Sequence, residues 1–271
     1  MRFKCAGIVL ATVLFGSFFA LSAQAACRSK ARVPSSTKSI SSKAVLGSQS
    51  AASSKVGAPA SSSLPTSLSA EIGSSNGPVT VEQLNSANPK AAEESFCNGS
   101  SSSGDSGCST NADAVGPINN AISKYSITRR GEIVGVVANM LFESGGWAEN
   151  VNANPGQGTR CMMMWNYIST YANELHPKEY ASLIGSSAGS PDSASDSVKN
   201  KVRELVLNPD DTFASGFWYL VTVATKYHGD ESKLRDGNLD DFKDYVENGI
   251  VTTWSSAREQ WWKEANQFLM V

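Results

Sequence analysis

The feature that most constrains the fold is a run of apolar residues, IVGVVANMLF, at positions 133–142. A helix that is apolar almost all round lies in the interior of its domain. The rest of the chain must therefore supply the elements that cover this helix. The run ends in Glu143, and Ser144, Gly145 and Gly146 follow it.

A narrow polar stripe runs along the same helix at spacings of three and four residues: Glu132, Gly135, Asn139 and Glu143. Residues at these spacings share one face of a helix. Gly145 and Gly146 allow the backbone to turn with φ > 0 and leave space beside the acid. A carboxyl group partly withdrawn from water keeps its proton more readily, and can donate it to a leaving glycosidic oxygen. Glu143 is therefore a candidate catalytic acid.

The residues after position 110 have the composition of a folded domain, because all six tryptophans lie there. About 160 residues are enough for one domain with a real core. Apolar residues recur at helical spacing, and the alternation typical of strands is scarce. We therefore expect an all-α domain of seven or eight helices at 111–271. One of these helices is expected to run from Gly158 to Leu175.

The N-terminal part of the chain has a different character. Residues 1–25 carry a basic start, an apolar core and the small-residue pattern Ala23-Gln24-Ala25, which is typical of a secretory signal peptide. Residues 26–110 are rich in Ser and Ala, and we expect a disordered, glycosylated linker with a short helix possible near its end. No other run is apolar enough to span a membrane. The protein is expected to be secreted.

Charge is distributed unevenly along the chain. Residues 28–70 hold six basic residues and no acidic one, whereas residues 71–271 hold 15 basic and 25 acidic residues. An acidic domain is a poor partner for nucleic acid, whose phosphates require Lys and Arg. We therefore expect no nucleic-acid partner, and the basic segment is interpreted as a solvated linker.

Four cysteines remain after removal of the signal peptide: Cys27, Cys97, Cys108 and Cys161. An even number in an exported chain indicates two disulfides. A local Cys97–Cys108 pair is our preference, and a Cys108–Cys161 pair is the alternative. Two histidines and no CxxC pair argue against a zinc site, and no metal or other cofactor is expected. Asn98 lies in an N-glycosylation signal, Asn98-Gly99-Ser100.

Two short blocks of the sequence resemble a known superfamily. FESGGW, at 142–147, resembles the HETGGW motif of family 19 chitinases, and its ESG resembles the helix-end motif of lytic transglycosylases and goose-type lysozymes. NPGQGTRCMMMWNYISTYA, at 154–172, resembles the glycine turn and apolar helix that line the cleft in these families. The whole chain resembles secreted fungal lysozyme-like proteins that carry PGQGTR.

The resemblance implies a lysozyme-like fold and a glycosidase, of the muramidase or chitinase type, with Glu143 as its general acid. The implied partner is a β-1,4-linked N-acetylhexosamine polymer, either peptidoglycan or chitin, and we expect a monomer. The candidate substrate-binding residues are Asn139, Trp147, Gln157, Gly158, Thr159, Asn166 and Tyr167. Trp147 is expected either to stack on a sugar ring or to cap the core.

The chain also departs from the chitinase pattern. Phe142 stands where the chitinases have histidine, and the loop after the helix offers only Glu149 as a second acid. The group that activates water is therefore open: it is either the substrate itself or a polar side chain, for which the candidates are Asn139, Gln157, Thr159 and Asn166. The alternatives are a non-catalytic wall-binding or host-interaction protein and a surface protein whose Ser-rich stalk is the functional part. A helix-end acid paired with an arginine, such as Arg160, would favour the non-catalytic alternative.

Overall fold

The computed structural model describes residues 77–99, 107–185 and 190–271. The predicted signal peptide, most of the predicted linker and Cys27 lie outside the described residues. The described part is predominantly helical and contains isolated β-bridges but no strand. Eight of its nine α-helices lie within residues 111–271, in agreement with the predicted all-α class.

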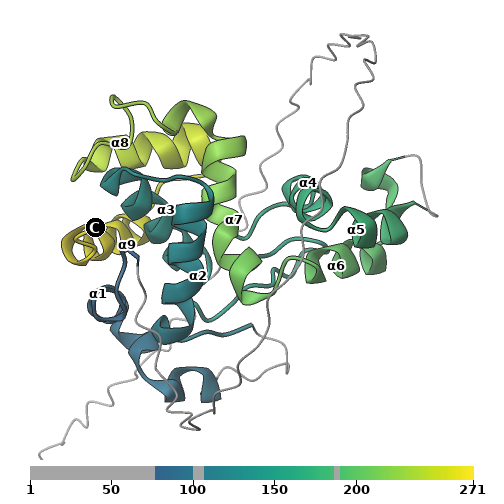
Figure 1. Ribbon diagram of the computed structural model, residues 1–271, viewed down its shortest axis with the longest axis horizontal. Helices are drawn as coiled ribbons and strands as arrows, with labels where there is room; N and C mark the ends of the chain where they lie inside the picture. The colour runs from purple at the N-terminus through teal and green to yellow at the C-terminus, as the bar shows by residue number, and fades with distance from the viewer. Residues whose placement is uncertain (1–76, 100–106, 186–189) are drawn as a thin grey trace, which may run out of the picture. The chain divides into compact units, whose positions relative to one another are not determined.

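The helix α3 (Arg130–Glu143) forms the centre of the core (Figure 1). Every residue from Glu132 to Leu141 is buried, as the apolar run predicts. The helices α7 (Pro209–Thr222) and α9 (Ser256–Phe268) pack against α3, and α2 (Asn111–Lys124) packs against α7. The covering elements that the sequence requires are therefore other helices.

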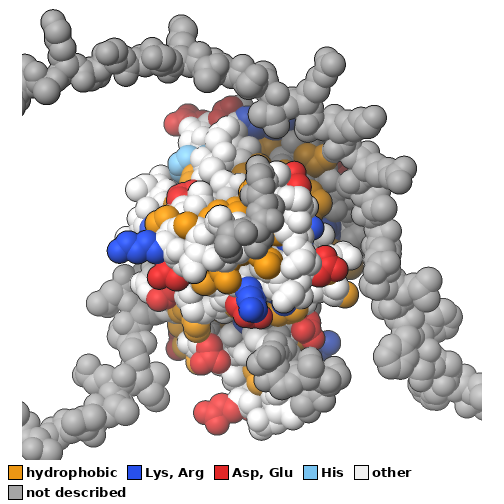
Figure 2. Space-filling model, turned by 90° about the vertical axis from the view of Figure 1, so that its right-hand side faces the viewer, with side chains coloured by type: hydrophobic (Ala, Val, Ile, Leu, Met, Phe, Trp, Pro, Cys, Tyr) orange, Lys and Arg blue, Asp and Glu red, His pale blue; other side chains and the backbone are white. Residues whose placement is uncertain are grey.

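Three further helices pack on one another: α4 (Trp165–Leu175), α5 (Pro177–Ile184) and α6 (Asp196–Glu204). Aromatic rings join α4 to α7, with centroids 4.8 Å apart in the Tyr171–Trp218 pair and 5.1 Å apart in the Tyr167–Tyr219 pair. Figure 2 shows this side of the molecule, where acidic side chains are scattered among apolar ones.

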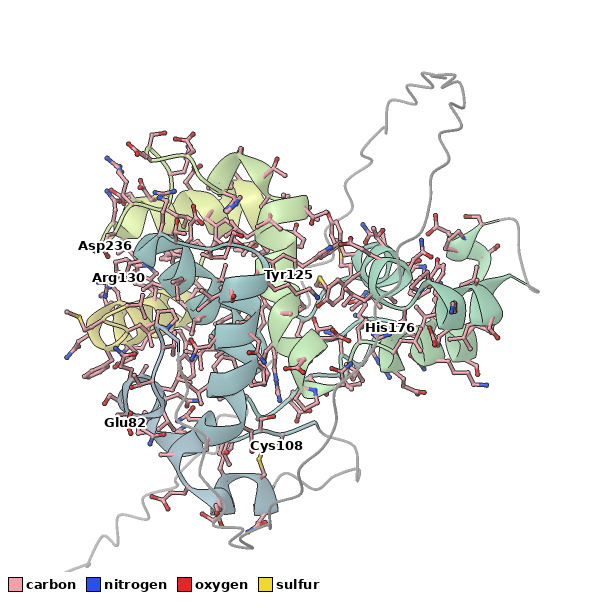
Figure 3. The ribbon with its side chains drawn as sticks, in the orientation of Figure 1. Glu82, Cys108, Tyr125, Arg130, His176 and Asp236 are labelled. Atoms are coloured by element: carbon pink, nitrogen blue, oxygen red, sulfur yellow. A yellow bond between two sulfur atoms is a disulfide. The ribbon has the colours of Figure 1, made fainter. Side chains whose placement is uncertain are left out.

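The C-terminal part closes over the polar stripe of α3. It contains α8 (Leu239–Asp244), a π-helical segment (Tyr245–Ile250) and α9. The buried Glu132 carboxylate accepts hydrogen bonds from Arg129 and from the backbone N–H of Gly229, both at 2.8 Å. Arg130 donates to the backbone oxygen of Leu269 at 2.8 Å and pairs with Asp236, which is labelled beside it in Figure 3.

The helical unit begins earlier than the predicted boundary at residue 111. The helix α1 (Val81–Ala87) is capped by Thr80 and Gln83 in a capping box and packs against α9. Leu84 is fully buried. Short 3₁₀-helices follow at Pro89–Ala92 and Glu94–Gly99, and others lie at Pro191–Ser193 and Thr225–Tyr227.

The predicted helix from Gly158 is wrong in its first part, because α4 begins at Trp165. Gly158 instead forms isolated antiparallel bridges to Val151 and Met163. Thr159 has φ +68° and Met162 has φ +46°, left-handed conformations that end any helix. The apolar spacing of this segment reflects burial in a tight turn.

The preferred Cys97–Cys108 disulfide is present, with its Cα atoms 5.6 Å apart. Figure 3 labels Cys108 near the start of α2. Cys161 is a free thiol, so the alternative Cys108–Cys161 pairing is wrong, and so is the expectation of a second disulfide that includes Cys161. Asn98 is exposed, beside the disulfide. Within the described ranges, no helix has the length and apolarity needed to cross a membrane.

Gly216 generates a prediction about the approach of α7 to α3. A Cβ atom at this position would lie 2.8 Å from Val136 Cγ1 and 2.9 Å from Cys161 Sγ. Gly216→Ala should therefore lower the free energy of unfolding by about 1–3 kcal/mol, the usual cost of overpacking. Urea denaturation of the wild type and the variant measures this change in the free energy of unfolding.

Gly116→Ala is the matched control, because nothing lies within 4 Å of a Cβ atom at this site in α2. This control should be neutral or stabilising by about 0.5–1 kcal/mol, since Ala favours a helix over Gly. Equal effects of the two substitutions would contradict close packing at Gly216.

Candidate functional site

Glu143 is the last residue of α3, and the chain turns back on the helix directly after it. The backbone N–H of Gly146 donates to Leu141 O at 2.8 Å, and Ser144 Oγ donates to Met140 O at 2.7 Å. Three consecutive residues are left-handed: Gly145 (φ +62°), Gly146 (φ +71°) and Trp147 (φ +76°). The predicted glycine turn is present, and Trp147 extends it at a conformational cost.

The Glu143 carboxylate pairs with an arginine from the far end of the sequence. Arg258 Nη2 on α9 donates to Glu143 Oε1 at 2.5 Å, and Arg258 Nη1 donates to Asn139 Oδ1 at 2.7 Å. The guanidinium carbon lies 4.0 Å from the centroid of the Phe142 ring. One side chain thus contacts three residues at the end of α3.

This ion pair lies at the edge of the core. The Arg258 side chain is 5% exposed and the Glu143 side chain is 20% exposed. Among the described residues, Glu143 Oε2 has no hydrogen-bond donor. An ion pair is a contact of the ionised carboxylate, whereas a general acid must carry a proton. The arginine pairing considered from sequence is therefore present, but its partner is Arg258.

Arg160, the partner considered from sequence, has another role. It is 1% exposed and donates to the backbone oxygens of Trp147 and Glu149, both at 2.9 Å. Its other nitrogen donates to Gly107 O and to Ser109 Oγ, both at 2.6 Å. Burial lowers its pKa to about 10. Arg160 joins the turn after Glu143 to the residues beside the disulfide.

Two buried asparagines hold the same turn from the other side. Asn88 Nδ2 donates to Gly146 O at 3.0 Å, and Asn111 Oδ1 accepts from Trp147 Nε1 at 3.0 Å. Asn88 is 1% exposed and Asn111 is fully buried. Sequence reasoning missed both, because Asn88 lies in the predicted linker and Asn111 resembles an ordinary helix start.

The structure changes the interpretation of several predicted substrate-binding residues. Trp147 is fully buried, and the centroid of its ring lies 5.1 Å from that of Phe213. The ring is therefore not available to stack on a sugar. Asn139 is 4% exposed and Thr159 is fully buried, which leaves neither side chain open to a polymer. Trp147 therefore caps the core, the second of the two roles expected from sequence.

The remaining predicted residues contact α6 or α7 or face solvent. Gln157 O accepts from Arg203 Nη1 at 3.3 Å, and Gly158 is buried in its two bridges. Asn166 is exposed, and Tyr167 is partly exposed with its ring against Tyr219. Described contacts join none of these four predicted residues directly to Glu143. Glu149 as a whole residue is exposed, but partial desolvation of its carboxyl group raises its pKa, and the positive charge of Arg160 acts in the opposite direction.

The free thiol of Cys161 lies close enough to Glu143 for the carboxylate to affect its pKa. Burial, together with the Glu143 carboxylate, raises the pKa of the thiol to about 12, and hydrogen bonds with Ser215 and Asn139 act in the opposite direction. A thiol with this pKa stays protonated at neutral pH and is a poor nucleophile. No group of three or more His, Cys, Asp or Glu residues in the described ranges is arranged to hold a metal ion.

Comparisons of the chain with protein-family models, with curated proteins and with solved structures found no match. The chemistry of the site therefore has to be inferred from its own residues. These comprise a partly exposed carboxylate at the end of a buried helix, an arginine on one of its oxygens and a tightly held glycine turn.

The Arg258–Glu143 pair generates a prediction about stability. Arg258→Met should lower the free energy of unfolding by about 3 kcal/mol, because it leaves a partly buried carboxylate unpaired. Adding Glu143→Gln should recover about 1 kcal/mol or more, since it removes the unpaired charge. Chemical denaturation of both single variants and the double variant measures the coupling. Strictly additive losses would contradict the ion pair.

Lys263→Met is the control for this cycle. Lys263 also binds a carboxylate, that of Glu259 at 2.7 Å, but the two side chains are 55% and 33% exposed. Exposed ion pairs contribute little to stability, so this variant should unfold almost as the wild type does.

The raised pKa of Cys161 predicts slow alkylation in the native state. At pH 8 the thiol should react with iodoacetamide at least tenfold more slowly than in denaturant, because only the thiolate is reactive and the native pKa is about 12. Peptide mass spectrometry after timed labelling separates Cys161 from Cys27. Equal alkylation rates with and without denaturant would show that the fold neither shields the Cys161 thiol nor raises its pKa.

Proposed function

We propose that this protein is a secreted lysozyme-like glycoside hydrolase that cleaves a β-1,4-linked N-acetylhexosamine polymer, with Glu143 as its general acid. The observation that carries the proposal is the position of Glu143. It ends the buried helix α3 with its side chain 20% exposed and only one carboxylate oxygen held by a described residue.

The two oxygens of Glu143 would have different tasks. Oε1 accepts from Arg258 Nη2 at 2.5 Å, and this bond fixes the orientation of the carboxyl group. When the group is protonated, Oε2 carries the proton and transfers it to the leaving glycosidic oxygen. Arg258 then stabilises the carboxylate that remains, because a bond to a charged acceptor is stronger than one to a neutral acceptor.

The second part of the reaction would use the substrate's own N-acetyl group. Of the four side chains named for water activation, Asn139 is 4% exposed and Thr159 is 0% exposed, and no described contact joins Gln157 or Asn166 to Glu143. The acetamido oxygen attacks the anomeric carbon as the leaving oxygen takes the proton from Glu143, and a cyclic oxazolinium ion forms. Water then opens this ring and gives a proton back to the Glu143 carboxylate. In substrate-assisted hydrolysis of this kind, the acetamido group takes the place of the carboxylate nucleophile.

Peptidoglycan is the first proposed substrate and chitin the second. The sequence resemblance at 142–147 and 154–172 supports a polymer of N-acetylhexosamine. The net negative charge of residues 71–271 disfavours tight capture of anionic walls, and the basic segment at 28–70 would partly compensate.

A second candidate function is non-catalytic binding of the same polymer. The close Arg258–Glu143 ion pair favours it, because the carboxylate then has a partner within the fold and serves a structural role. In this case the protein would bind the polymer of a cell wall without cleaving it. Cleavage and binding assays on the same preparations separate the two functions.

The test of the proposed function is release of soluble sugar from peptidoglycan and from chitin by wild type and by Glu143→Gln. Glutamine keeps the shape of the side chain but has no acidic proton, so the variant should lose about 100-fold or more of the activity. If neither protein releases sugar while both bind the same polymer equally, the binding function replaces the enzyme.

A further inference from the structure

The helix α9 contributes a second side chain to the turn after Glu143. A Cβ atom placed on Gly146 would lie 3.1 Å from Cη2 of Trp261 and 3.0 Å from Asn88 Oδ1. The edge of the indole ring therefore lies against the backbone of the turn, where any other residue would place its side chain. Gly146 thus allows the close approach of Trp261, in addition to its left-handed φ.

Trp261 is one helical turn beyond Arg258, so the two side chains lie near one another on α9. Arg258 contacts Glu143 and Trp261 contacts Gly146. The same stretch of α9 thus supplies the partner of the acid and an aromatic ring three residues along the turn. Residue spacing in the sequence does not predict these contacts, because Glu143 and Arg258 are 115 residues apart.

Trp261 differs from the other tryptophans near it in its exposure. Trp147 is fully buried and Trp262 is 7% exposed, so both serve the core. Trp261 is only partly buried: it packs on the core at one side and still reaches solvent. Of these three rings, it is the one placed to meet a ligand at the Glu143 turn.

We propose that Trp261 is the aromatic platform on which a sugar ring of the substrate stacks beside Glu143. This inference rests on the proposed function and assigns to Trp261 the role that sequence suggested for Trp147. One face of an N-acetylglucosamine ring is lined by C–H groups, and such a face packs on the flat surface of an indole. Stacking would place a sugar next to the carboxyl group that acts on its glycosidic bond.

The experiment measures binding separately from cleavage. The full mature chain carrying Glu143→Gln is titrated with a soluble N-acetylglucosamine tetramer and with a soluble peptidoglycan fragment, using calorimetry. In this background Trp261→Ala should weaken binding at least tenfold, and Trp261→Phe should weaken it less because a ring remains. Trp254→Ala is the control, since Trp254 is also partly buried but packs on Phe242 at 5.8 Å.

A second measurement does not depend on the folding of a variant. N-bromosuccinimide oxidises accessible indoles, and peptide mass spectrometry locates the oxidised residue. The tetramer, at a concentration that saturates the Glu143→Gln chain, should protect Trp261 and leave the oxidation of Trp254 unchanged.

The outcomes separate this inference from the proposed function. Tenfold weaker binding of Trp261→Ala with selective protection of Trp261 supports the platform. Unchanged affinity, or oxidation of Trp261 unaffected by bound tetramer, overturns it, while cleavage by the wild type would leave the enzyme proposal intact. If the wild type cleaves neither polymer and the Glu143→Gln chain binds neither soluble ligand, both proposals fail.

Discussion

The rest of the candidate site depends on the buried guanidinium of Arg160. It donates to four acceptors on two separate segments, Trp147 and Glu149 on one and Gly107 and Ser109 on the other, and its charge lies 4.8 Å from the ring of Phe213. Backbone oxygens in a non-helical turn have no helix or sheet partners, so a buried turn requires donors of this kind. Arg160 stabilises the left-handed path at 145–147, which begins two residues after Glu143.

The polar stripe of α3 shows how an apolar helix can carry charges in the interior. Its two ends have different partners: Glu132 is bound by Arg129 and the Gly229 N–H, and Glu143 is bound by Arg258. Each carboxylate thus meets a cation, which is the condition for holding a charge away from water. The difference lies in exposure, since Glu132 is 1% exposed and Glu143 20%. This difference makes Glu143 the end that a ligand can reach.

Local patterns predicted much of the fold, and long-range contacts account for what they missed. The burial of α3 and its polar stripe follow from residue spacing, and the glycine turn follows from Gly145 and Gly146. The partner of Glu143 could not be found in this way, because Arg258 is one of several arginines and lies 115 residues away. The start of α4 was misplaced for a related reason: the bridges and left-handed residues at 158–163 satisfy tertiary contacts that override helical spacing.

Arg258 also gives a physical reason for an aromatic residue at position 142. The guanidinium lies 4.0 Å from the centre of this ring and binds Glu143 and Asn139 through its two terminal nitrogens. A protonated histidine at position 142 would put a second positive charge against the arginine, whereas the negative face of a phenyl ring attracts it. The aromatic residue and the arginine therefore fit one another, and together they fix the carboxyl group through Oε1. The other oxygen, Oε2, has no donor among the described residues and is the one left for a ligand.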